Sequence, residues 1–290
     1  MKPAGDTRPA DAMNLHLVIH GASVAEHDLQ HLARLSGAQS VRRVDGGACR
    51  LIGAERRPGI AEYCAAARLD FGFVPAHRRL ADFSLLAIDM DSTLITIECI
   101  DEIADLAGVK AEVSAITAAA MSGELDYAQS LLRRVDLLRG LDQDCLARVY
   151  DERLRLSPGA ETLLAAARGA GVKTLLVSGG FDYYTERLQA RLGLDYSIAN
   201  ALEIEGGRLS GRIIGNIVDA EAKAAKVGAV RAALGITADR TIAIGDGAND
   251  LAMMAEAGVS IAYRAKPIVR AKADYALDYV GLDGVLNLFA

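Results

Sequence analysis

The spacing of hydrophobic residues divides the beginning of the chain into alternating strand-like and helix-like segments. Residues 13–20 alternate between apolar and polar positions as in a strand, whereas residues 23–35 follow helical spacing up to Gly37. The further predicted elements are a hairpin at 40–52 turning at 45–47, a helix at 59–69 and a strand at 70–74. This βαββαβ order is typical of a ferredoxin-like α+β fold. We therefore predict a small domain over residues 1–80.

Beyond a linker at 75–82, the pattern changes to continuous apolar runs. Three runs, at 83–88, 174–177 and 241–245, suit strands that are buried on both faces of a parallel sheet. Helical spacing recurs between and after these runs, at 158–170, 182–192, 220–234 and 250–257. This alternation predicts a doubly wound α/β fold over residues 83–290.

The segment between the first two predicted strands is much longer than one crossover helix requires. Residues 95–156 have Ala and Leu at helical spacing. We predict that they form a helical cap over the carboxyl ends of the strands, where ligands bind in folds of this kind. A cap in that position can exclude water and select the substrate.

Composition narrows the classes of function. Of 290 residues, 51% are hydrophobic and 24% are charged, which is ordinary for a globular protein. The net charge of −6 and the absence of Trp argue against a nucleic-acid partner. No apolar run is long enough to span a bilayer, and residues 1–11 lack the apolar core of a signal peptide. We therefore expect a cytoplasmic protein with no membrane partner.

Histidine and cysteine usage excludes further kinds of site. All five histidines lie at or before His77, so the larger region cannot use a Ser-His-Asp triad. His27 and His31 have the spacing of a metal pair, but they lack the Glu of HExxH, and a solvated helix face explains them better. The four cysteines include no CxxC pair, which predicts reduced thiols packed as small hydrophobic groups.

Two acidic residues, Asp89 and Asp91, directly follow the first apolar run. Carboxylates this close repel each other unless a cation or a proton compensates. A calcium loop of the EF-hand type is excluded, because its sixth position is Leu94 rather than Gly and its twelfth is Ile100 rather than Glu. The pair indicates anion and cation chemistry at this strand end.

Other strand ends and one helix carry candidate groups. Ser178 and the two glycines after it precede a helix, and they offer a hydroxyl and backbone amides to a phosphate. The loop 245–250, Gly-Asp-Gly-Ala-Asn-Asp, is neither a dinucleotide fingerprint nor a P-loop, and it offers hard oxygen ligands for magnesium. Lys223, on a predicted helix, can add a positive charge, although a surface lysine is the default interpretation of this residue taken alone.

In chain order, these features resemble the haloacid dehalogenase superfamily of phosphohydrolases over residues 83–290. Its pattern is a DxD strand end, a Ser or Thr strand end, a Lys and an acidic GDxxxD loop. Within the superfamily, the resemblance is to phosphoserine phosphatases, and it is carried by 89–94 with Glu98, by 178–182, by 245–250, and by 125–131 with 133–135. The first 80 residues resemble ACT-type modules in pattern alone and show no ligand motif, so a purely structural or dimerising role is equally consistent.

The resemblance implies a role for each motif residue. Asp89 would be the nucleophile that forms an aspartyl phosphate, and Asp91 would be the acid and base, with a raised pKa. Mg²⁺ would be held by the Asp89 and Asp246 carboxylates and the Asp91 carbonyl. Asp250 would orient Lys223 or a water. The phosphoryl oxygens would be held by Ser178, the Gly179 amide and Lys223.

The resemblance also implies an amino-acid substrate, O-phospho-L-serine, hydrolysed to L-serine in the last step of serine biosynthesis. Glu98 would pair with its ammonium and Arg134 with its carboxylate, and Asn249 would hydrogen-bond the phosphate or nearby solvent. Met121 and Tyr127 are expected to cover the pocket, although core packing explains them equally well. The alternatives are another small phosphomonoester or a non-enzymatic amino-acid sensor. A homodimer is left open.

Overall fold

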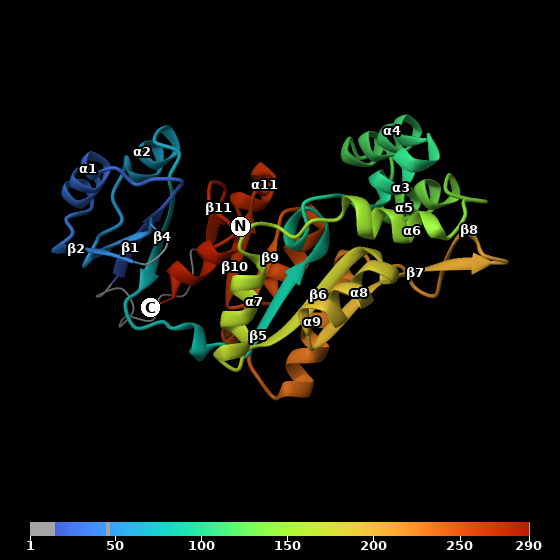
Figure 1. The fold of residues 1–290 in the computed structure, drawn as a ribbon. Helices are drawn as coiled ribbons and strands as arrows, with labels where there is room; N and C mark the ends of the chain where they lie inside the picture. The colour runs from blue at the N-terminus through green and yellow to red at the C-terminus, as the bar shows by residue number, and fades with distance from the viewer. Residues whose placement is uncertain (1–14, 45–46, 290) are drawn as a thin grey trace.

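The computed structural model describes residues 15–44 and 47–289, and these form two sheets (Figure 1). The smaller sheet is antiparallel with the order β2-β3-β1-β4, and its elements are β1 (Leu15–His20), α1 (Glu26–Ser36), β2 (Ser40–Arg43), β3 (Cys49–Ile52), α2 (Ile60–Ala66) and β4 (Asp70–Pro75). The βαββαβ prediction is confirmed. The turn predicted at 45–47 falls partly outside the described residues.

The larger sheet has the order β11-β10-β9-β5-β6-β7-β8. All neighbouring strands are parallel except the edge pair β7 and β8. Its strands are β5 (Leu85–Asp89), β6 (Lys173–Phe181), β7 (Tyr196–Glu205), β8 (Arg208–Ile214), β9 (Thr241–Gly245), β10 (Val259–Tyr263) and β11 (Tyr275–Leu277). The three predicted strands are the central ones, β9, β5 and β6, whereas the sequence analysis did not identify the four outer strands.

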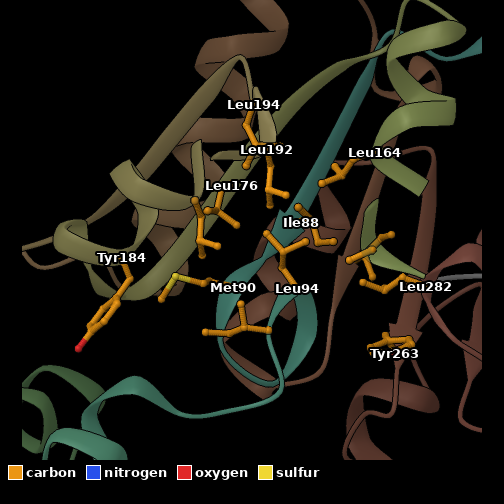
Figure 2. Close-up of a cluster of buried hydrophobic side chains, with 14 of the residues drawn as sticks. Ile88, Met90, Leu94, Leu164, Leu176, Tyr184, Leu192, Leu194, Tyr263 and Leu282 are labelled. Carbon is orange, nitrogen blue, oxygen red and sulfur yellow. The ribbon is translucent and has the colours of Figure 1, made fainter. Parts of the chain in front are cut away.

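Helices cover both faces of the larger sheet, as the doubly wound prediction requires. On β5, Leu86 and Ile88 join one core with α7 (Ala160–Gly169) and α8 (Asp182–Leu192), part of which Figure 2 shows. The alternate residue Leu85 joins a second core with α9 (Ala220–Leu234) and α10 (Leu251–Ala255). Both faces of β5 are therefore buried, because side chains of a strand alternate between the faces.

The cap lies at one end of this sheet, away from the N-terminal sheet (Figure 1). It consists of α3 (Cys99–Ala107), α4 (Lys110–Met121), α5 (Tyr127–Asp136), α6 (Asp144–Arg148) and the turn η5 (Val149–Arg153). Ile95 and Leu156 pair in an isolated bridge where the chain enters and leaves it. The β7–β8 hairpin also reaches the cap, because the Gly140 amide donates to the Leu209 carbonyl.

Short helical segments complete the chain: η3 (Leu80–Asp82), η4 (Met90–Leu94), η6 (Ala238–Arg240), η7 (Ala248–Asp250), α11 (Pro267–Arg270) and η8 (Leu282–Leu288). Within residues 15–44 and 47–289, no helix combines the length and the apolar character that crossing a membrane requires.

The N-terminal sheet packs against β11 and η8. The buried Asp70 carboxylate accepts hydrogen bonds from the backbone amides of residues 278, 279 and 280. The Tyr275 hydroxyl donates to the Phe73 carbonyl, and Arg50 donates to the Asn287 carbonyl. The two sheets are thus joined by buried polar contacts as well as by apolar ones.

Candidate active site

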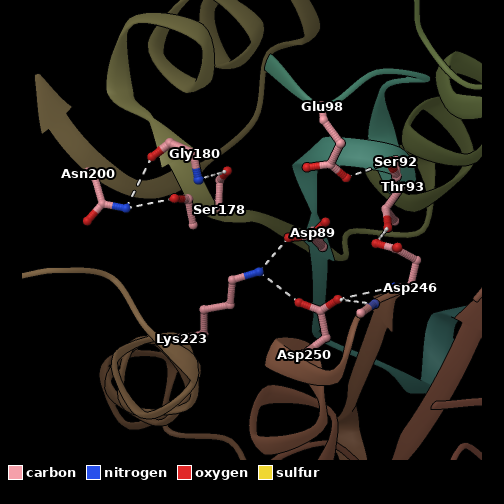
Figure 3. Close-up of polar contacts among 12 residues, drawn as sticks. Asp89, Ser92, Thr93, Glu98, Ser178, Gly180, Asn200, Lys223, Asp246 and Asp250 are labelled. Carbon is pink, nitrogen blue, oxygen red and sulfur yellow. Dashed lines mark hydrogen bonds and ion pairs between the residues drawn. The ribbon is translucent and has the colours of Figure 1, made fainter. Parts of the chain in front are cut away.

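The carboxyl ends of the three central strands bring the predicted acidic groups together (Figure 3). Asp89 ends β5, Asp246 follows β9, and Ser178 lies near the end of β6. Regular pairing of β6 with β7 ends at Val177, and a register shift follows, so Ser178 leaves the regular ladder where the sequence predicts a strand end. Parallel strands place these ends at one edge of the sheet, which is why residues so far apart in sequence meet.

Lys223 lies at the centre of this group. Its Nζ is 2.5 Å from Asp89 Oδ1 and 2.7 Å from Asp250 Oδ1, and all three side chains are buried. The other oxygen of Asp250 accepts the amides of Asp246 and Gly247, at 3.1 and 3.0 Å. Asp250 thus holds both the ammonium and the loop after β9.

Burial and neighbouring charges both shift the pKa values of Asp89 and Lys223. Burial and the Asp250 charge raise the pKa of Asp89 well above its usual range, and the Lys223 ammonium partly offsets this. Burial lowers the pKa of Lys223, but the two carboxylates outweigh it and raise that pKa overall. Lys223 therefore remains charged, and Asp89 lies in a site where additional positive charge is strongly favoured.

The donor set fits a divalent cation. Carboxylate oxygens of Asp89, Asp246 and Asp250 all lie within 4.8 Å of one another, with one ammonium among them. Both oxygens of Asp250 are engaged, whereas Asp246 accepts from the Thr93 hydroxyl through Oδ1 at 3.1 Å and retains Oδ2. Burial, followed by the Asp250 charge, raises the pKa of Asp246 to about 6. Such hard, close-set oxygens match the preferences of Mg²⁺.

Asp91 and Glu98 form the side of the site nearest the cap. Asp91 Oδ1 accepts the Cys99 amide at 3.1 Å, and burial, followed by the Glu98 charge, raises the pKa of Asp91 to about 7. Glu98 precedes α3 and accepts from the Ser92 hydroxyl at 2.7 Å. Ser92 has a left-handed backbone with φ 56°, which an L residue rarely adopts. Glu98 is exposed, so the site is open to solvent on this side.

Residues 178–180 lie in the irregular last part of β6, hereafter the Ser178 loop, and are held from several directions. The Gly180 amide donates to Ser178 Oγ at 2.9 Å, and the Tyr127 hydroxyl, from α5 of the cap, donates to the Gly179 carbonyl at 3.0 Å. A Cβ at Gly180 would lie 2.6 Å from Asp91 Oδ2, so a side chain at this position would force the Asp91 carboxylate to shift. Asn200 contacts the same loop (Figure 3).

Residues 86–255 match the family model of haloacid dehalogenase-like hydrolases. The chain belongs to this family. Residues 17–60 match a second family model, described only as a domain of unknown function.

Two curated relatives of this haloacid dehalogenase-like hydrolase share the name phosphoserine phosphatase. A phosphoserine phosphatase of Albidiferax ferrireducens is 51% identical over 223 residues, which are 75% of this chain and 94% of the relative. A phosphoserine phosphatase of a Polaromonas species is 53% identical over 215 residues, covering 72% and 91%. With relatives this similar over most of its length, the chain is an enzyme.

Solved structures of family members match both sheets. A hydrolase of Salmonella enterica aligns with a TM-score of 0.87 at 33% identity, covering 96% of this chain and 99% of that one. A probable phosphoserine phosphatase of Vibrio cholerae aligns with a TM-score of 0.83 at 36% identity, covering 98% and 88%. The fold of the haloacid dehalogenase-like hydrolases with a small α+β N-terminal domain is therefore shown.

Arg134, Asn249 and Met121 are the other residues that the sequence predicts for the site of this hydrolase. Arg134 is half-buried on α5, and its Nε donates to the Ser130 carbonyl at 3.3 Å. Burial raises the pKa of Glu98 overall, and the Arg134 charge opposes part of that rise. Asn249 lies in η7 next to Asp250. The side chain of Met121 lies outside the described part of the chain.

Sequence reasoning missed three residues that position the predicted ones in this hydrolase. Ser92 and Thr93 lie within the motif at 89–94, but the sequence indicated no role for them. Their hydroxyls donate to Glu98 and Asp246, respectively. Asn200 was missed entirely, because it lies on β7, a strand the sequence analysis did not identify. The motif's two hydroxyl residues were a usable signal for the first two, whereas a lone Asn offers no local signal.

Proposed function

We propose that this enzyme is a magnesium-dependent phosphoserine phosphatase that hydrolyses O-phospho-L-serine to L-serine and phosphate. The observation that carries the proposal is the meeting of Asp89, Lys223 and the Ser178 loop at one edge of the sheet, where Glu98 lies close enough to Arg134 for the Arg134 charge to act on it. An anion-holding centre beside one acidic and one basic side chain is complementary to a phosphate ester that carries both an ammonium and a carboxylate. The names of its relatives support the same assignment.

In the first half-reaction, a carboxylate oxygen of Asp89 attacks phosphorus, and the bond from phosphorus to the serine oxygen breaks. Protonated Asp91 gives its proton to the departing alkoxide, for which a pKa of about 7 is well suited at neutral pH. Lys223 offsets the charge on Asp89, and Ser178 with the Gly179 amide holds the phosphoryl oxygens.

In the second half-reaction, Asp91, now a carboxylate, takes a proton from water as the water oxygen attacks phosphorus. The aspartyl phosphate breaks, phosphate leaves, and both aspartates return to their starting states. A similar solved phosphoserine phosphatase, with a TM-score of 0.68 and 38% identity over 72% of this chain and 99% of that one, represents a phospho-aspartyl intermediate analogue. This similarity supports a covalent intermediate on Asp89.

Mg²⁺ would be held by Asp89, Asp246 and the Asp91 carbonyl, and when bound it would neutralise charge that builds up on the phosphoryl oxygens. This ligand set is supported by the closeness of the three carboxylates and by Asp250, both of whose oxygens already accept hydrogen bonds.

The proposal also covers the domain boundaries, the cellular location and the metabolic role of the enzyme. We propose domains at 1–80 and 83–290 with the cap at about 95–156, a cytoplasmic location and a role in the last step of serine biosynthesis. The separate sheets and the Ile95–Leu156 bridge support the division.

The test is phosphate release from L-phosphoserine with and without Mg²⁺, beside an Asp89→Asn control. We expect turnover that chelation abolishes, that added Mg²⁺ restores and that Asp89→Asn lacks. After rapid quench with labelled phosphoserine, acid-stable and hydroxylamine-labile label is expected on Asp89. Label on Ser92 or Ser178 would overturn the covalent step.

A further inference from the structure

Asn200 joins two parts of the site that are separate in sequence. It is completely buried on β7, and its Nδ2 donates to the carbonyls of Gly179 and Gly180 at 2.8 and 3.3 Å (Figure 3). Its Oδ1 accepts the Val218 amide at 2.7 Å. We infer that Asn200 is a positioning residue that presets both the phosphate-holding loop 178–180 and the helix α9 that carries Lys223. This inference rests on the proposed function and concerns how its phosphoryl site is organised.

The loop needs an external support because of its composition. Gly179 and Gly180 have no side chains to pack, and glycine has the greatest backbone freedom of any residue. Holding both carbonyl oxygens restrains the two peptide planes that follow Gly179 and Gly180. The Gly180 amide is then directed to Ser178 Oγ, which leaves the Ser178 hydroxyl hydrogen available to an anion.

The second contact of Asn200 reaches the Lys223 arm of the site. Val218 directly precedes Asp219, whose Oδ1 caps α9 by accepting the Ala222 amide at 2.9 Å. Lys223 follows in the first turn of that helix and contacts Asp89. One buried amide group therefore links the hydroxyl and amide donors of the loop to the ammonium. Donors arranged in advance need no reorganisation when charge develops on the phosphoryl group.

Two substitutions separate the contacts. Asn200→Asp retains an oxygen that can accept the Val218 amide but loses the donors to the loop, and Asn200→Ala loses both. Ser197→Ala is the matched control: Ser197 lies on the same strand, and its hydroxyl donates to Gln189 at 2.6 Å, without contact to the loop. Each variant is the full chain, and folding is monitored by circular dichroism and thermal unfolding.

The readouts are the Kd for inorganic phosphate with Mg²⁺, measured by calorimetry, and KM and kcat for phosphoserine. We expect both Asn200 variants to bind phosphate about tenfold more weakly. Their kcat/KM should fall about a hundredfold, as expected when donors are misplaced by about 1 Å. Ser197→Ala should stay within about twofold of wild type.

Reversible unfolding raises an apparent Kd by the inverse of the folded fraction. Kd and KM are therefore measured well below the unfolding transition of each variant, where partial unfolding cannot imitate the expected result. If the Asn200 variants keep the wild-type Kd and KM and lose only thermal stability, the residue is merely structural and the inference is wrong. If the wild-type enzyme releases no phosphate from phosphoserine, the proposed function fails instead. The phosphate Kd then still decides the role of Asn200.

Discussion

At the scale of single residues, the acidic groups of the site share one arrangement: a neighbour holds one oxygen and leaves the other available. Asp246 Oδ1 accepts from the Thr93 hydroxyl, and Asp91 Oδ1 accepts from the Cys99 amide. Glu98 Oε1 accepts from the Ser92 hydroxyl in the same way. Asp250 is the exception, with both oxygens engaged. Carboxylates held in this way have defined orientations before any ligand arrives.

Thr93→Val should weaken metal activation while preserving the fold. The side chain is buried and Val has nearly the same shape, so the main loss is the hydroxyl that orients Asp246. Loss of such a supporting contact typically costs about 10- to 100-fold in metal affinity. Activity measured against Mg²⁺ concentration checks this. Thr96→Val, at an exposed position of the same segment, should leave the activation curve unchanged, and an equal shift in both variants would contradict the role of Thr93.

Arg134→Gln should discriminate between substrates. If Arg134 binds the substrate carboxylate, kcat/KM for phosphoserine falls about 10- to 100-fold, because charged hydrogen bonds are lost. Turnover of an aryl phosphate without a carboxylate should not change. Arg133→Gln, at the exposed neighbouring position, is the control. Unchanged phosphoserine turnover in Arg134→Gln would favour another small phosphomonoester as the substrate.

At the scale of elements, the site is assembled where cap helix α5 meets residues 178–180 in the last part of β6. The Tyr127 hydroxyl is buried enough that its pKa rises to about 12, so it remains a donor at any ordinary pH. Its acceptor, the Gly179 carbonyl, is also an acceptor for Asn200. The cap and the sheet therefore share one oxygen of the phosphate-holding loop.

Tyr127→Phe removes this contact between cap and loop and retains the ring. We expect kcat/KM for phosphoserine to fall about 2- to 12-fold, the range for one neutral hydrogen bond. The effect should be smaller than that of Asn200→Ala, which releases two carbonyls and the Val218 amide. Tyr183→Phe, on α8, is the control in the same kinetic assay. A decrease in both variants alike would show that the hydroxyl of Tyr127 has no special role.

At the scale of the whole molecule, the N-terminal sheet is fastened to the last residues of the larger domain. His20 is buried in this contact, its Nδ1 lies 3.4 Å from the Asn287 amide nitrogen, and its Nε2 has no partner in the described part of the chain. Burial lowers the pKa of His20 to about 4. The folded protein thus holds a neutral histidine where the unfolded chain binds a proton more readily.

His20 should make the protein less stable in acid. Because its pKa is lower in the folded state than the usual value of about 6.5, its contribution is complete above that value. It is lost as the pH falls from about 6.5 to about 4, by at most about 3 kcal/mol. The free energy of unfolding, measured with denaturant, should fall over this pH range in the wild type more than in His20→Gln, by up to that amount. Asp70, whose pKa burial raises, is common to both proteins and cancels in the comparison.

His31→Gln, at an exposed position on α1, is the matched control and should follow the wild-type curve. Parallel pH curves for wild type and His20→Gln would contradict the prediction.

Much of the site could be predicted because its information is local. Asp89, Ser178 and Asp246 each follow an apolar run, and a strand buried on both faces is apolar over its whole length. The carboxyl ends of parallel strands share one edge, so identifying the strands already placed these residues near one another. The N-terminal elements followed from periodicity in the same way. The outer strands were missed because β11 spans only three residues and β7 is mixed in polarity.

By itself, the sequence determined the element types, the two kinds of sheet and the chemical groups at the strand ends. Periodicity and composition are local properties of a few neighbouring residues, and they predict whether each of those residues is buried or exposed. Only the tertiary structure decided which groups are in contact. Lys223 contacts Asp89 across 134 residues, and Asn200 contacts both the Ser178 loop and Val218. Asp70 accepts a hydrogen bond from the Asp278 amide, directly after β11. These contacts join single polar residues from distant segments, and their partners are selected by packing that no local pattern records.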